Sequence, residues 1–155
     1  MTLKLLDRGI EWLLAAVLIV LVAIGGAQIV WRFALNDPLP WVVESSVLLM
    51  VWATMLSGYV GVRRNVHLSA DFTGLRMSAA VRWWLDLLCL ALCLLFVGVY
   101  GIGSLKVIDA MDGIPFTSIP VQQPVLYWSL PVGAVLMAIA LLARLRAQLA
   151  MKERV

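Results

Sequence analysis

The chain has 155 residues, of which 63% are hydrophobic and only 14% are charged. Ordinary soluble domains carry about 25% charged residues, so this composition excludes a soluble globular domain and indicates that most of the surface faces lipid. The formal net charge of +3 is small and lies in short clusters, which excludes nucleic acid as a partner, because nucleic-acid binding calls for a continuous basic face.

Four apolar segments are long enough to cross a bilayer, whose hydrocarbon core of about 30 Å takes about 20 helical residues. They lie at about 12–34, 41–62, 83–106 and 124–143. Six of the seven tryptophans fall near the ends of these segments, where indole rings prefer the headgroup region. We therefore predict an all-α integral membrane protein with four transmembrane helices, forming one membrane domain over 1–155. The first segment is interpreted as an uncleaved span.

The first outer turn joins the first two spans. Asn36, Asp37 and the prolines around Leu39 form the turn, and Trp41 opens the second span. Arg32 closes the first span and Glu44 follows the start of the second, so a short antiparallel turn brings them to similar depth. We expect an ion pair between them; the alternative is that each side chain extends separately toward the headgroups.

The loop between spans two and three begins with two adjacent basic residues, Arg63 and Arg64. His67 follows Arg63 by four residues and Asp71 follows His67 by four, which places them on one face of a resumed helix. A structural clamp is favoured for this pair over proton handling. Beyond it, an interfacial helix is predicted at about 72–82, lying along the membrane surface.

The third span contains Cys89 and Cys93, one helical turn apart, which are interpreted as small buried apolar residues rather than as a disulfide or a metal site. The following loop, 106–123, contains Asp109 and Asp112 together with glycine and proline, and predicts an ordered, non-helical stretch. In the fourth span, Pro131 is expected to bend the helix by removing one backbone hydrogen bond.

Orientation follows from the basic residues, which concentrate on the cytoplasmic side of membrane proteins. Ten of the twelve lie in the N-terminal flank, the second loop and the C-terminal tail, while Arg32 and Lys106 lie on the opposite side. We predict that both termini are cytoplasmic.

The middle of every predicted span lacks an ionisable side chain. Such groups are costly in lipid and mark ion or proton paths where they occur. We therefore expect no catalytic residues, cofactor or metal. The single histidine, His67, excludes haem ligation by two histidines of one chain.

Three local patterns together resemble those of a known family. The second span opens with aromatic and acidic residues (Pro40-Trp41-Val42-Val43-Glu44), it is followed by arginine, histidine and aspartate at four-residue steps (Arg63, His67, Asp71), and the last span is entered through Ile119-Pro120 and Tyr127-Trp128-Ser129-Leu130-Pro131. In length, order and spacing the chain resembles the small membrane subunit of tripartite ATP-independent periplasmic (TRAP) transporters. It departs from the family pattern at Ser45, where a second acid is common.

The resemblance implies partners and a role in the bacterial inner membrane. A periplasmic solute-binding protein would deliver an organic acid, such as a C4-dicarboxylate or a sugar acid, and a large membrane subunit would move it inward with sodium. The small subunit would brace the large one and help to dock the binding protein. Residues implied for these interfaces are Arg32, Asp37, Trp41, Glu44, Arg63, Arg64, His67, Asp71, Asp109 and Asp112.

Two other functions are compatible with the sequence. A stand-alone four-helix exporter acting as a homodimer would need an acid in the middle of a span to bind cations, and the first span offers only Gln28 as a polar side chain. A membrane enzyme or redox anchor subunit is the third possibility, and a haem or flavin absorption band would identify it.

Overall fold

The computed structural model describes residues 2–64 and 78–152. The helices are α1 (Thr2–Ala34), α2 (Pro40–Arg63), α3 (Ala79–Ala110), α4 (Pro124–Tyr127) and α5 (Ser129–Lys152). Among the described residues, the extended structure is limited to one isolated bridge between Pro115 and Gln122. Four helical stretches are long and apolar enough to cross a membrane, the fourth running from α4 into α5. The predicted all-α class with four potential spans is confirmed at that level.

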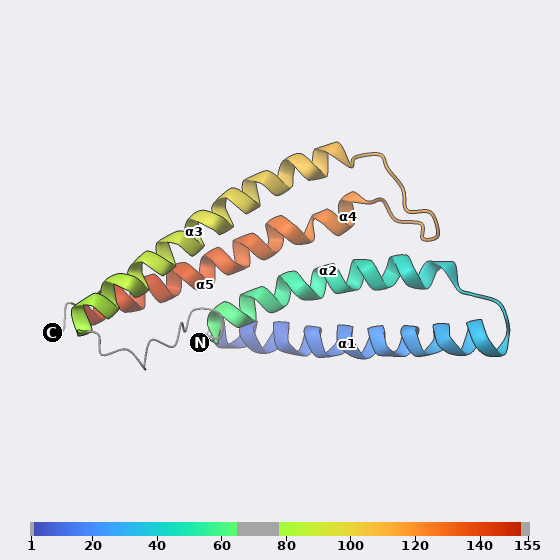
Figure 1. The fold of residues 1–155 in the computed structure, drawn as a ribbon, viewed down its shortest axis with the longest axis horizontal. Coiled ribbons are helices and arrows are strands. Elements are labelled where there is room, and N and C mark those ends of the chain that lie inside the picture. Colours follow the sequence, from blue (N-terminus) through green and yellow to red (C-terminus); the bar gives the residue numbers. More distant parts are fainter. Residues whose placement is uncertain (1, 65–77, 153–155) are drawn as a thin grey trace.

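The helices form two antiparallel pairs that lie side by side. Helix α1 lies against α2, α2 against α5, and α5 against α3, so α2 and α5 occupy the middle of the assembly (Figure 1). The start of α1 and the end of α5 lie at the same end of the molecule, and the loop after α3 returns toward the start of α2.

Helix α1 contacts α2 through one narrow seam. Its less exposed positions follow spacings of three and four residues, which is the period that keeps one face against a neighbouring helix. These positions include Asp7, Ile10, Leu14, Val17, Leu21, Ile24 and Gln28. Between Trp12 and Trp31 the remaining exposed residues of α1 are all apolar, as a lipid-facing helix requires.

Helix α5 is the centre of the packing. Leu141 and Ala134 join Leu90 and Val97 of α3 in one buried cluster, and Ala140 joins a second cluster with residues of α1 and α2. Small residues permit this closeness: a Cβ on Gly133 would lie 2.8 Å from Cβ of Met55. Glycine at this position lets α5 approach α2 more closely than any other residue would allow.

The fourth span runs from α4 into α5, and Trp128 between them keeps helical backbone angles (φ −60°, ψ −21°). Pro131 follows three residues later. Because proline has no N–H, the carbonyl of Tyr127 lacks its usual partner from position 131. The proline expected to bend this span therefore removes one hydrogen bond at the junction of α4 and α5. Of the predicted interfacial segment 72–82, residues 72–77 lie outside the described part, and 79–82 form the first turn of α3.

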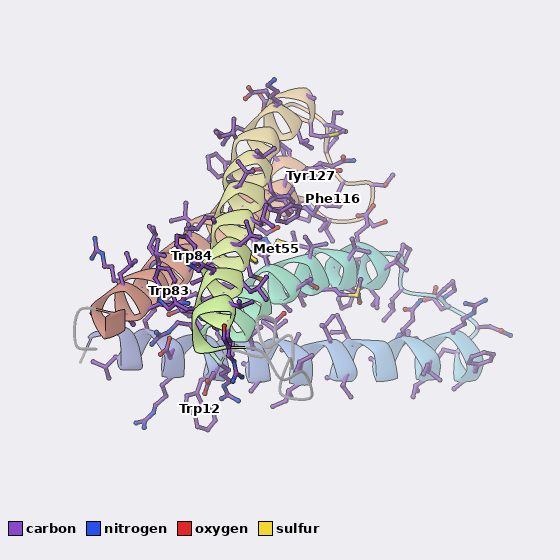
Figure 2. All side chains as sticks on the ribbon, turned by 60° about the vertical axis from the view of Figure 1, so that its left-hand side comes forward. Trp12, Met55, Trp83, Trp84, Phe116 and Tyr127 are labelled. Atoms are coloured by element: carbon purple, nitrogen blue, oxygen red, sulfur yellow. The ribbon has the colours of Figure 1, made fainter. Side chains whose placement is uncertain are left out.

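Most tryptophans lie near a helix end, whereas Trp12 lies ten residues into α1. Trp12 is 73% exposed and points away from the other helices (Figure 2), and Trp84 at the start of α3 is also exposed, with its ring edge-on to Trp83 at 5.0 Å. Trp52 lies within α2, away from both ends, and its Nε1–H donates to the carbonyl of Val125 at 3.1 Å. That hydrogen bond satisfies the indole nitrogen at this depth.

Candidate functional site

The end of the molecule opposite the start of α1 and the end of α5 is organised around Glu44, in the second turn of α2. It is called the outer end below because we predict cytoplasmic termini. Its carboxylate accepts hydrogen bonds from three successive backbone N–H groups, those of Thr117 at 2.9 Å, Ser118 at 2.7 Å and Ile119 at 3.1 Å. Consecutive N–H groups that converge in this way form an anion-binding concavity. A carboxylate from one helix therefore holds the loop that connects two others.

The loop between α3 and α4 has a defined shape around this contact. Its two arms pair through Phe116 N–H to Val121 O at 3.0 Å and Gln123 N–H to Ile114 O at 2.9 Å. Gly113 enters the loop with φ +75°, in the left-handed region that favours glycine. The expectation of an ordered, non-helical stretch holds for 111–123, whereas residues 106–110 still belong to α3.

The expected ion pair between Arg32 and Glu44 is not formed, and that expectation was wrong. Both oxygens of Glu44 are taken by the backbone of the loop, while the Arg32 guanidinium lies 5.9 Å from the centre of the adjacent Phe33 ring. Several short N–H···O bonds in one geometry satisfy a carboxylate better than one long, flexible side chain, whose ordering costs entropy.

The turn between α1 and α2 is fixed by a polar side chain of α1. Gln28 Oε1 accepts from the backbone N–H of Leu39 at 3.2 Å, and Asn36 adopts φ +54° to reverse the chain. Gln28 is the one polar side chain that the first span would offer to a stand-alone exporter. Its bond to the turn is structural instead.

The remaining outer-side candidates lie exposed at this same end. Asp37 and Trp41 flank the first turn, Asp109 lies in the last turn of α3, and Asp112 follows it. The structure thus gathers these side chains on the outer end, together with the loop that Glu44 holds. His67 and Asp71, predicted to share a helical face, lie outside the described residues.

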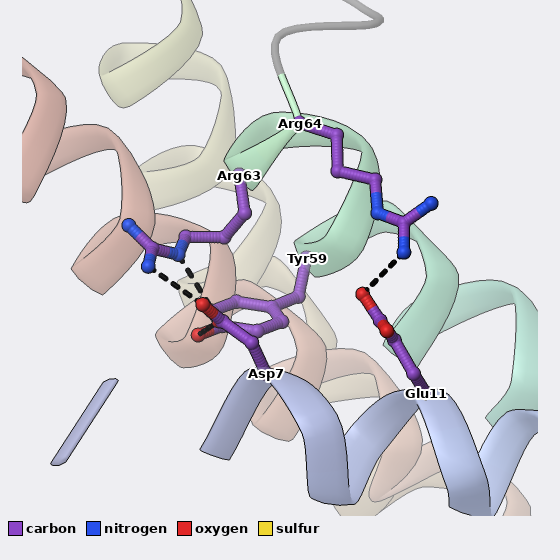
Figure 3. A network of polar contacts seen from close by, with 5 residues as sticks. All are labelled: Asp7, Glu11, Tyr59, Arg63 and Arg64. Atoms are coloured by element: carbon purple, nitrogen blue, oxygen red, sulfur yellow. Dashed lines mark hydrogen bonds and ion pairs between the residues drawn. The ribbon is translucent and has the colours of Figure 1, made fainter. Parts of the chain in front are cut away.

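The opposite end carries a charged cluster that joins α1 to α2 (Figure 3). Arg63 donates through Nε to Oδ1 of Asp7 at 3.1 Å and through Nη2 to Oδ2 at 2.7 Å. The buried Tyr59 hydroxyl donates to the same Oδ1 at 2.6 Å. Two parallel bonds between guanidinium and carboxylate fix both the distance and the orientation of the helices.

A second ion pair lies one helical turn along α1. Arg64 Nη2 donates to Oε1 of Glu11 at 2.6 Å. This pair is more open, with side-chain exposures of 63% and 40% against 27% and 25% for the pair of Arg63 and Asp7. The less exposed pair therefore contributes more to the packing of α1 on α2 than the open one.

Asp7, Glu11 and Tyr59 are absent from the residues predicted from sequence. A signal for them existed: Asp7 and Glu11 are four residues apart at the start of α1, and two arginines end the antiparallel neighbour. Arg63 and Arg64 were interpreted as orientation signals that needed no partner. The partner of Glu44 carried no comparable signal, because three backbone N–H groups leave no mark in the sequence.

Together these contacts describe anchors rather than a reaction or transport centre. The carboxylates of Asp7, Glu11 and Glu44 are all engaged by other groups of the chain. Among the described residues, no group of three or more histidine, cysteine, aspartate or glutamate side chains is placed to hold a metal ion. What the arrangement can do is keep helices and loop rigid relative to one another.

Comparison with known proteins gives three matches, all to components of TRAP transporters. The family model for the DctQ component of tripartite ATP-independent periplasmic transporters matches residues 21–151. The C4-dicarboxylate TRAP transporter small permease protein DctQ of Vibrio cholerae is 28% identical over 94 residues, covering 61% of this chain and 40% of that protein. The sialic acid TRAP transporter permease protein SiaT of Haemophilus influenzae is 31% identical over 142 residues, covering 86% of this chain but only 22% of that protein.

Proposed function

Because the chain belongs to the family of DctQ components of tripartite ATP-independent periplasmic transporters, we propose that it braces a large sodium-coupled permease subunit and helps a periplasmic binding protein to dock. The family makes the chain a small permease subunit, a multi-pass inner-membrane transport component and not an enzyme. The bracing role, the sodium coupling and the docking role are the parts that we propose.

The bracing role is supported by one observation: the charged contacts of the helices lie at the two ends of the molecule and join groups of the same chain. Ion pairs and hydrogen bonds tie α1 to α2 at one end and α2 to the outer loop at the other. A subunit that carried an ion or an acid across the bilayer would need a polar site at mid-depth. A rigid set of apolar helices suits a stationary support.

The match to SiaT favours a large membrane partner. Nearly all of this chain corresponds to about a fifth of that permease protein, so a segment of this kind occurs there in one polypeptide with a much longer remainder. The matching family is described as one component of a tripartite transporter, which supports another component as the counterpart of that remainder. We therefore propose a large TRAP membrane subunit as its direct partner.

The outer end is the proposed docking area for a periplasmic binding protein. Asp37, Asp109 and Asp112 are exposed there, and Glu44 gives the loop 111–123 a fixed form. The exposed charges of this end, Arg32 and Lys106 against the three aspartates, give a net charge of only −1, so shape contributes more to this docking than long-range attraction. The distribution of basic residues supports cytoplasmic termini, and with them a periplasmic position for this end.

An uptake assay tests the proposal. Proteoliposomes would contain the large subunit with or without this chain, together with the binding protein and radiolabelled C4-dicarboxylate or sialic acid under an inward sodium gradient. We expect sodium-dependent uptake only when both membrane subunits are present, and none with this chain alone. Solute flux through the chain alone, or full uptake without it, would contradict the proposal.

A further inference from the structure

Helix α2 has one exposed face along its length that carries two hydroxyl groups. Val43, Val47, Met50, Thr54 and Ser57 are all exposed and follow one another at steps of four, three, four and three residues. The steps repeat the seam by which α1 contacts α2, and such a period keeps a face against another helix over its length. These five residues are called the α2 stripe below.

The α2 stripe places two hydroxyl groups on the outside of the bundle within an apolar helix. Thr54 donates to the carbonyl of Met50 at 2.7 Å, and Ser57 donates to the carbonyl of Thr54 at 2.8 Å. Each donor is thereby satisfied, but each oxygen keeps acceptor capacity. A lipid tail offers nothing to these oxygens, whereas a donor side chain on a neighbouring helix does.

The serine hydroxyls of α3 and α5 are buried, unlike those of Thr54 and Ser57. Ser104 of α3 is 4% exposed and Ser129 at the start of α5 is fully buried, each bonded to a carbonyl of its own helical stretch. Helix α2 also has the lowest mean hydropathy of the four potential spans, although it lies in the middle of the assembly. The hydroxyls of Thr54 and Ser57 distinguish its exposed side from that of α1, whose exposed residues between Trp12 and Trp31 are all apolar.

We infer that the α2 stripe is the surface on which a transmembrane helix of the large permease subunit packs, with a hydrogen-bond donor opposite Thr54 and Ser57. This inference rests on the proposed function. The occupant follows from the match to SiaT, in which the corresponding segment shares a polypeptide with a much longer permease. Small residues on the stripe let that helix approach closely, at the shallow crossing angle common among membrane helices.

Paired tryptophan substitutions test the inference on the full chain co-expressed with the large subunit of the same organism. Ser57→Trp places an indole on the stripe, and Ala16→Trp places one on the exposed surface of α1, away from the stripe. We expect Ser57→Trp to lower recovery of the large subunit with tagged chain by about tenfold, and Ala16→Trp to leave it unchanged. Equal recovery with both variants overturns the inference.

A photocrosslinking measurement keeps the test decisive if Ser57→Trp does not fold. Benzoylphenylalanine at position 54 should form a crosslinked product with the large subunit, and the same residue at position 16 should not. A product with a second copy of this chain, or with no protein, overturns the inference while the proposed function stands. Failure of the unsubstituted chain to recover the large subunit would instead contradict the proposed function itself.

Discussion

The Arg63 guanidinium at the end of α2 donates two hydrogen bonds to the Asp7 carboxylate near the start of α1, the shorter of them 2.7 Å long. Fifty-six positions separate the two residues in sequence, yet they fix how the first helix meets the second. The Tyr59 hydroxyl on the same carboxylate adds a third bond from α2.

This cluster makes the first prediction, a loss of stability in Asp7→Ala. The change leaves a partly buried guanidinium and a buried hydroxyl without their acceptor, and we expect it to cost about 1–2 kcal/mol. Glu11→Ala is the matched control, because it breaks the more open pair with Arg64 and should cost less than about 1 kcal/mol. Thermal unfolding in detergent compares the two variants; equal losses would contradict the assigned difference.

The second prediction concerns the loop held by Glu44. Glu44→Gln removes the charge and replaces one acceptor oxygen by a donor, so the three N–H groups of 117–119 lose part of their partner set. We expect backbone hydrogen exchange at Thr117, Ser118 and Ile119 to quicken by about tenfold. Asp37→Asn, which changes an exposed carboxylate in the other outer turn, should leave that exchange unaltered. Unchanged exchange in Glu44→Gln would show that the carboxylate does not hold the loop.

The third prediction concerns two glycine-to-alanine changes, of which one should lower the stability of the protein and the other should not. Gly133→Ala brings a methyl group to 2.8 Å from Met55 Cβ, an atom that cannot move without the backbone of α2, and overpacking of this kind costs about 1–3 kcal/mol. A Cβ on Gly98 would meet nothing within 4 Å. Gly98→Ala should therefore be neutral or stabilising by up to about 1 kcal/mol, because alanine favours helix. Thermal unfolding in detergent measures the stability of both variants. An undiminished stability of Gly133→Ala would show that α5 lies farther from α2 than the 2.8 Å approach implies.

The fourth prediction tests orientation in the membrane. In a chain whose Cys89 and Cys93 are replaced by alanine, Asp112→Cys should react with a membrane-impermeant thiol reagent in intact spheroplasts. Ala150→Cys, at the exposed end of α5, should react only after the membrane is permeabilised. Labelling of Ala150→Cys from outside would reverse the proposed topology and move the binding-protein surface to the other end.

The predicted ion pair between Arg32 and Glu44 was wrong. The prediction rested on the short turn that the two residues flank, and so on groups that are near in sequence. The carboxylate instead accepts from Ser118 and its neighbours, more than seventy residues away. A backbone N–H has the same chemistry at every non-proline residue, so only folding reveals which of them converge on a carboxylate.

Composition and hydrophobic length by themselves determined the class of this protein. An apolar run of about 20 residues has few stable states other than a helix in lipid, since its backbone must be satisfied internally, and the four long helices followed from that. The family resemblance came from the order and spacing of local motifs, such as Trp41 to Glu44. Tertiary structure alone decided which helices are neighbours, that α5 lies at the centre, that Asp7 meets Arg63 and that Glu44 holds a loop. Lipid treats all apolar faces alike, so the choice among them depends on close packing and on a few polar contacts between residues far apart in the chain.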